Sequence, residues 1–81
     1  MSISAEEIVT RGKALYEQRL RGQLETGNIG KILVINIDTG DYEMDSDRLV
    51  ASDRAVERFP GAPLYAMKIG FPSLGKLRTF A

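Results

Sequence analysis

Apolar residues in the first third of the chain recur at intervals that place them on one face of a helix. A capping-box pattern, with Ser4 and Glu7 at its two ends, marks where this helix begins. Gly27 marks where it ends, because glycine commonly follows the last helical turn. The pattern predicts a helix over residues 5–26. Its apolar face comprises Ile8, Leu15, Tyr16, Leu20 and Leu24.

Gly12 falls on the same face as these apolar residues. A glycine inside a helix costs about 1 kcal/mol relative to alanine. Such a cost is tolerable where another backbone or side chain packs closely against the glycine. We therefore expect a close contact between the first helix and a neighbouring element at Gly12.

The segment 31–37 is almost wholly aliphatic, and both of its alternating faces are apolar. This pattern is typical of a strand that lies centrally or is covered on both sides. Turn residues at 38–41 then predict a hairpin, with Gly40 supplying the positive φ angle. In the returning strand, residues 41–44, Tyr42 and Met44 should face one side of the sheet and the acidic residues the other.

A second helix is predicted over residues 46–59, capped by Asp45 or Ser46 and ended by Pro60. A third apolar strand is predicted over residues 64–69. The expected buried face of this helix comprises Leu49, Ser52, Ala55, Val56 and Phe59.

These elements predict an α+β fold with the order α-β-β-α-β. A crossover through the second helix should return the third strand beside the first. We therefore expect a three-stranded mixed sheet of order 2-1-3, packed by two helices. One helix on each face would cover both apolar faces of the central strand. Residues 1–81 form a single small domain in this interpretation, with residues 70–81 as a packed or mobile tail.

The amino-acid composition excludes several kinds of metal and catalytic site. The 81 residues include no Cys, no His and no Trp, which excludes Cys/His zinc sites, thiol catalysis and Ser-His-Asp triads. No apolar run approaches the roughly 18 residues of a membrane helix. The first residues are polar and acidic, unlike a secretory signal. We expect a cytoplasmic protein with no cofactor, no metal and no membrane partner.

Two acidic patterns in the sequence have features of functional sites. Asp38-Thr39-Gly40 resembles the active-site loop of aspartic proteases, but Asp41 replaces the usual alanine and the chain is short for that fold. Five acids within residues 38–47 could bind a divalent cation, yet the EF-hand glycine is missing. A hairpin turn and a charged edge strand explain these residues better. We expect no enzymatic activity.

Charge is segregated although the formal net charge is zero. Residues 36–59 carry three basic and seven acidic side chains, whereas residues 60–81 carry three basic and none acidic. One interpretation is a regulator that binds nucleic acid through basic residues of the first helix and the tail. The three basic side chains of residues 60–81 are few for phosphate binding. The basic set comprises Arg11, Arg19, Arg21, Lys76 and Arg78.

Several short segments between Tyr16 and Pro72 match a family pattern. They comprise Tyr16-Glu17, Leu20-Arg21, Asn28-Ile29-Gly30-Lys31, residues 37–43, Pro63-Leu64-Tyr65 and Ile69-Gly70-Phe71-Pro72. Together they resemble a family of short uncharacterised bacterial proteins, common in cyanobacteria. Some members of that family resemble the antitoxin halves of toxin–antitoxin pairs. The resemblance implies a protein-binding role and names no partner.

Our leading hypothesis is a small non-enzymatic protein-interaction domain. It would bind a protein partner, or a second copy of itself, through an exposed sheet face or edge and the apolar tail. Neutralising a toxin is the most specific form of this hypothesis. Aromatic and Met residues are enriched at interface cores, so five of them are candidate anchors. Each of the five could instead pack in the core of the protein itself. The candidate anchors are Tyr42, Tyr65, Met67, Phe71 and Phe80.

Overall fold

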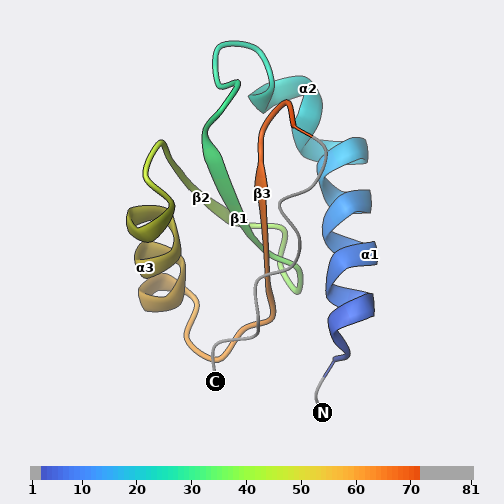
Figure 1. Ribbon diagram of the computed structural model, residues 1–81. Coiled ribbons are helices and arrows are strands. Elements are labelled where there is room, and N and C mark those ends of the chain that lie inside the picture. Colours follow the sequence, from blue (N-terminus) through green and yellow to red (C-terminus); the bar gives the residue numbers. More distant parts are fainter. Residues whose placement is uncertain (1–2, 72–81) are drawn as a thin grey trace.

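The computed structural model describes residues 3–71, with two helical segments and one sheet (Figure 1). The first helical segment consists of α1 (Ala5–Leu15), the π-helical turn η1 (Tyr16–Leu20) and α2 (Arg21–Leu24). The sheet strands are β1 (Ile32–Asn36), β2 (Tyr42–Asp45) and β3 (Leu64–Lys68). The remaining helix, α3 (Arg48–Arg58), lies between β2 and β3 in the chain. Of the tail predicted over residues 70–81, residues 72–81 lie outside the described part of the chain.

The first helix follows the predicted face but contains a π-helical turn that the sequence pattern did not predict. Ser4 caps it as expected, since its hydroxyl accepts the backbone N–H of Glu7 at 3.1 Å. Its buried positions 8, 12, 16, 20 and 24 repeat every four residues. In an α-helix each four-residue step rotates the face by about 40°. A π-helical turn contains more residues than an α-helical turn, so the π-helical turn at 16–20 rotates the buried positions back toward the sheet.

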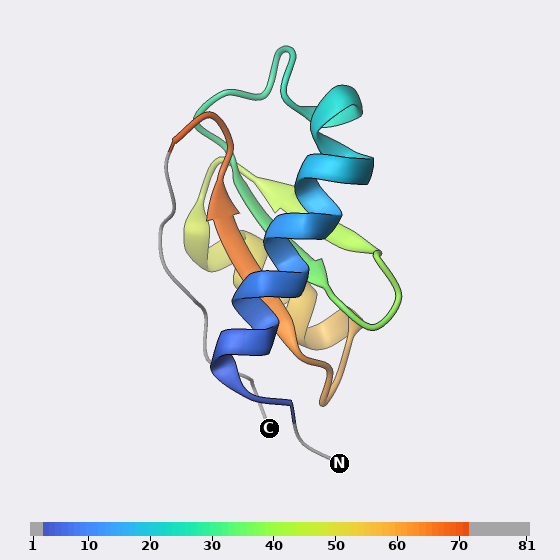
Figure 2. The same cartoon turned by 90° about the vertical axis from the view of Figure 1, so that its right-hand side faces the viewer.

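The predicted close contact at Gly12 is confirmed. A Cβ added at this position would lie against the ring of Tyr65 on β3, 2.6 Å from the Tyr65 Cβ. That separation is too short for two carbon atoms that are not bonded. Glycine at position 12 therefore lets α1 lie close to β3, and Figure 2 shows α1 crossing this face of the sheet obliquely.

The strand order β2-β1-β3 is as predicted, but the sheet is antiparallel throughout rather than mixed. Ile32 pairs with Asp45 of β2 and with Lys68 of β3. The reason is topological. The α3 crossover joins β2 to β3, so those two strands run in the same direction. Because β1 lies between them and is antiparallel to β2, it is antiparallel to β3 as well.

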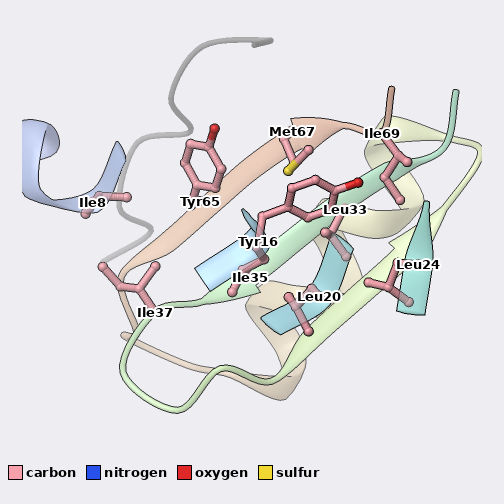
Figure 3. Close-up of a cluster of buried hydrophobic side chains, with 10 residues drawn as sticks. All are labelled: Ile8, Tyr16, Leu20, Leu24, Leu33, Ile35, Ile37, Tyr65, Met67 and Ile69. Carbon is pink, nitrogen blue, oxygen red and sulfur yellow. The ribbon is translucent and has the colours of Figure 1, made fainter. Parts of the chain in front are cut away.

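Each face of the sheet is covered by one helical segment, as the doubly apolar first strand indicated (Figure 1). Alternate residues of β1 face opposite clusters, and all five are buried. Figure 3 shows the cluster under the first helix. That cluster comprises Ile8, Tyr16, Leu20, Leu24, Leu33, Ile35, Ile37, Tyr65, Met67 and Ile69. The cluster under α3 comprises Ile32, Val34, Ala51, Ala55, Phe59, Leu64 and Ala66.

Helix α3 begins later than predicted, and its buried face includes the predicted Ala55 and Phe59 but not Leu49. Asp47, rather than Asp45 or Ser46, caps it: its Oδ1 accepts the backbone N–H of Leu49 at 2.8 Å. Leu49 was predicted to be buried but is 72% exposed, and Ala51 is buried instead. The predicted face (positions 49, 52, 55, 56 and 59) and the buried face (positions 51, 55 and 59) share Ala55 and Phe59. They differ at Leu49 and Ala51, which lie on opposite sides of this shared stripe. The small alanines of the buried face let α3 approach the sheet closely.

Candidate functional site

Three large apolar side chains are well exposed among the described residues, namely Ile29 at 60%, Leu49 at 72% and Phe71 at 50%. Ile29 lies in the connection before β1, and Phe71 follows β3. Both therefore lie at the end of the sheet where β1 begins and β3 ends. Leu49 belongs to α3 and is a separate apolar position.

Ile29 is held on a turn that is tied to the rest of the fold. The Asn28 side-chain amide donates to the carbonyl oxygen of Leu24 at 2.8 Å, which ends the first helix. The Gly30 N–H donates to the carbonyl oxygen of Ile69 at 2.8 Å, which joins the turn to the end of β3. The exposed position of Ile29 is thus a consequence of fixed backbone geometry.

Phe71 is positioned by the turn that follows β3. Its N–H donates to the carbonyl oxygen of Lys68 at 3.2 Å, and the Lys68 Nζ lies 4.7 Å from the centroid of its ring. Gly70 has a φ of 85°, and a Cβ there would lie 2.8 Å from the Ile29 Cδ1. Ile29 therefore packs over Gly70, the residue that precedes Phe71 in the chain. We call Ile29, Lys68, Gly70 and Phe71 the sheet-end patch.

The structure does not bring the five predicted anchors together on one surface. Tyr65 is 3% and Met67 is 7% exposed, and both belong to the core under the first helix. Tyr42 is partly buried against that core. Phe71 is exposed, and Phe80 lies outside the described residues. Ile29 was not among the predicted anchors. The sequence feature that could have indicated its exposure is an aliphatic residue within a glycine-containing turn, residues 27–30.

The basic residues proposed for nucleic-acid binding are partly engaged with acids on their own helix. Arg21 contacts Glu17 at 2.8 Å and Glu25 at 3.3 Å. The Arg21 guanidinium donates hydrogen bonds to the carboxylates of Glu17 and Glu25, and these bonds raise the pKa of Arg21 above its ordinary value.

The other basic candidates have different surroundings. Arg11 contacts Glu7 at 3.7 Å, so it too has an acidic partner. Arg19 lines a shallow cleft of about 310 Å³ beside the hairpin turn. Lys76 and Arg78 lie outside the described residues. Two of the three described arginines in the set are therefore offset by carboxylates.

The acidic residues around the hairpin serve the turn and the edge of the sheet. The backbone N–H of Asp38 donates to the Asn36 Oδ1 at 3.0 Å, and Gly40 adopts a φ of 84°. On β2, Glu43 contacts Arg58 at 2.7 Å and Asp45 contacts Arg54 at 3.4 Å. Across residues 3–71, acidic side chains do not gather in a group of three that could hold a metal ion.

Tyr16 is the buried polar group without a hydrogen-bond partner in the described structure. It is 4% exposed, and its hydroxyl contacts neither a donor nor an acceptor. Figure 3 shows its ring among the aliphatic side chains of the core. Burial, followed by the charge of Glu25, raises the pKa of Tyr16. Burial alone also raises the pKa of Tyr65.

Replacing Tyr16 by phenylalanine is expected to raise the free energy of unfolding by about 1 kcal/mol, because an unpartnered buried hydroxyl is removed. Urea unfolding of Tyr16→Phe measures the change, and Tyr42→Phe at a partly exposed site is the control. Stability should also fall as pH rises above about 10, since tyrosines of the unfolded chain ionise there first. Tyr16→Phe should weaken this alkaline loss, and an unchanged alkaline profile would contradict the assignment.

Comparisons with protein-family models, with curated proteins and with solved structures found no match. Within residues 3–71, neither helical segment is long and apolar enough to cross a membrane.

Proposed function

We propose that this chain is a small, non-enzymatic protein-interaction domain that binds a protein partner through the sheet-end patch. The observation that carries the proposal is that two large apolar side chains, Ile29 and Phe71, are exposed on hydrogen-bonded turns at the same end of the sheet, with Ile29 against Gly70, the residue before Phe71. Exposed apolar side chains that lie together are typical of protein-binding surfaces. Neutralising a toxin is the most specific form of the proposal.

The geometry of the patch favours binding for two reasons. Its turns are already ordered, so little conformational entropy is lost when a partner covers it. An aromatic anchor also buries a large area per side chain. Lys68, stacked on the Phe71 ring, places a positive charge at the rim of the patch. A partner with an acidic residue beside an apolar pocket would fit this arrangement.

The test compares a patch variant with a matched surface variant. The double change Ile29→Ser and Phe71→Ser should lower affinity for the partner by about 30-fold or more, the loss associated with removing interface hot spots. Leu49→Ser removes an even more exposed leucine outside the patch and should leave affinity unchanged. Tagged proteins would be used to capture partners from the source cells, and binding of the recovered partner would be measured by calorimetry.

Nuclease and salt separate this proposal from nucleic-acid binding. A protein that is recovered in stoichiometric amount after nuclease treatment, and is lost only with the patch variant, would support it. Recovery that vanishes with nuclease, or affinity that falls steeply with salt, would favour phosphate contacts through the arginines. Equal binding by the patch variant and the Leu49→Ser control would overturn the assignment of the patch.

A further inference from the structure

The outer edge of β2 faces an open groove of about 480 Å³, lined by residues 40–44 and by Arg58 of α3. Successive side chains of a strand point to opposite faces of the sheet. Five consecutive residues can therefore line one groove only where the groove runs along the edge of the strand. The residues of β2 are all partly exposed, whereas those of β1 are all buried. Within the described part of the chain, no strand lies beyond β2.

The hydrogen bonds of the hairpin show which backbone groups of β2 point into this groove. The Asn36 N–H donates to the carbonyl oxygen of Asp41 at 2.8 Å. Bonded positions alternate along an antiparallel pair, so the backbone groups of Tyr42 and Met44 are directed away from β1. The Arg58 guanidinium donates to the carbonyl oxygen of Tyr42 at 3.2 Å. The Tyr42 N–H and both backbone groups of Met44 have no hydrogen-bond partner among the residues that the structure describes.

We propose that β2 binds an extended segment of a protein partner as a fourth strand, and that basic and apolar residues alternate along this segment. The outward N–H and C=O groups of β2 bond the backbone of the segment, as in other strand additions. Every second residue of the segment then lies beside the acidic side of β2, and the residues between them lie beside its apolar side. This edge is distinct from the sheet-end patch.

The acidic side of β2 determines the charge of the segment. Asp41, Glu43 and Asp45 occupy alternate positions, so they share one side of the strand. Residues 36–59, which surround them in the chain, carry seven acidic and three basic side chains. Opposite charges that face each other across two strands are stabilising, and like charges are destabilising. A segment with lysine or arginine at alternate positions is therefore favoured, and β2 of a second copy is disfavoured.

The arginines beside these acids do not close the edge. Arg58 contacts Glu43 at 2.7 Å and Arg54 contacts Asp45 at 3.4 Å, but the two arginine side chains are 51% and 55% exposed. Ion pairs at such exposure contribute little to stability. A basic side chain of the segment can therefore share or replace these contacts. A backbone N–H of the segment can likewise replace Arg58 at the Tyr42 carbonyl oxygen.

The other side of β2 determines the apolar positions of the segment. Tyr42 and Met44 pack against the core under the first helix, as does Leu15 of α1, and all three remain partly exposed. An apolar side chain of a fourth strand on this side would lie beside Tyr42 and Met44 and cover them further. The apolar area gained is small, which is typical of weak interfaces. We expect a dissociation constant of roughly 100 micromolar.

The probe is an eight-residue peptide with blocked ends that alternates lysine and valine. NMR titration of the full chain should show saturable binding, with the N–H groups of Tyr42 and Met44 becoming protected from solvent exchange. A peptide that alternates glutamate and valine should bind about 10-fold more weakly. Equal binding of the two peptides would overturn the proposal. So would protection of both N–H groups in the free chain, because the chain itself or a second copy would then cover this edge.

Charge variants test the acidic side of β2. Asp41→Asn combined with Glu43→Gln should lower the affinity for the lysine peptide about 5-fold or more. Asp53→Asn combined with Glu57→Gln removes the same charge from exposed positions of α3 and should leave the affinity unchanged. Equal losses in the two variants would show that the peptide responds only to net charge, which would overturn the proposal.

A backbone variant tests strand addition itself. Met44→Pro removes an outward N–H and should weaken peptide binding about 10-fold or more. Met44→Ala keeps that N–H and is the control for loss of the side chain; NMR checks that the sheet of both variants is intact. A folded Met44→Pro variant that binds as well as Met44→Ala would overturn the proposal. The Ile29 and Phe71 variant should bind the lysine peptide normally, so the two proposals can fail independently.

Discussion

Replacing Gly12 by alanine is expected to lower the free energy of unfolding by about 2–3 kcal/mol, the usual cost of overpacking a core. The added Cβ would meet the base of the Tyr65 side chain, 2.6 Å from its Cβ. That part of a tyrosine cannot rotate away, since it is attached to β3. Alanine's better helix propensity, worth about 1 kcal/mol, offsets only part of this loss. Urea unfolding followed by circular dichroism measures the change.

Gly22 provides the matched control within the same helical segment. A Cβ added there meets no atom within 4 Å, and the residue is exposed in α2. Gly22→Ala should therefore raise the free energy of unfolding by about 0.5–1 kcal/mol, through helix propensity alone. Opposite signs at the two glycines would establish the close approach of α1 to β3. A gain in stability at Gly12 would show that this approach is looser than described.

The second large effect is expected at Leu33, at the centre of the sheet. Its side chain is 0% exposed and belongs to the core under the first helix. Leu33 pairs with Met44 on one side and Met67 on the other. Leu33→Ala should lower the free energy of unfolding by about 3–4 kcal/mol, because a cavity forms where the surroundings cannot collapse. Small domains have total stabilities of about 5–10 kcal/mol, so this is a large fraction.

Leu49→Ala is the control for Leu33→Ala, since it deletes the same atoms. At 72% exposure, the change should alter the free energy of unfolding by less than about 0.5 kcal/mol. Thermal and urea unfolding of the two variants side by side provide the comparison. A loss of about 2 kcal/mol or more at Leu49 would mean that the Leu49 side chain is buried, as the sequence pattern predicted.

Much of the fold followed from local patterns in the sequence. The apolar spacing located the first helix, and the doubly apolar segment 31–37 indicated a central strand. Gly12 on an apolar face indicated a close contact before its partner, Tyr65, was known. These features depend on neighbours within a few residues, where helix and strand periodicity act. Strand order followed from the same reasoning, because a hairpin and a crossover leave few arrangements.

The candidate site was less predictable. Tyr65 and Met67 had the composition of interface anchors, but both belong to the core under the first helix. Ile29 lies in a turn, where no periodicity distinguishes a buried from an exposed side chain. Its exposure depends on hydrogen bonds to residues about forty positions later in the chain, such as the Gly30 bond to Ile69. Sequence patterns do not reveal such pairings.

The sequence by itself determined the kinds of elements, their order and the two apolar faces of β1. The antiparallel sheet follows from the predicted hairpin, crossover and strand order, although the sequence analysis expected a mixed sheet. Tertiary structure alone decided that α3 buries Ala51 rather than Leu49 and that the first helix contains a π-helical turn. Local periodicity determines which residues share a face. Which face is buried depends on how closely two elements can approach, and that depends on side chains distant in the sequence.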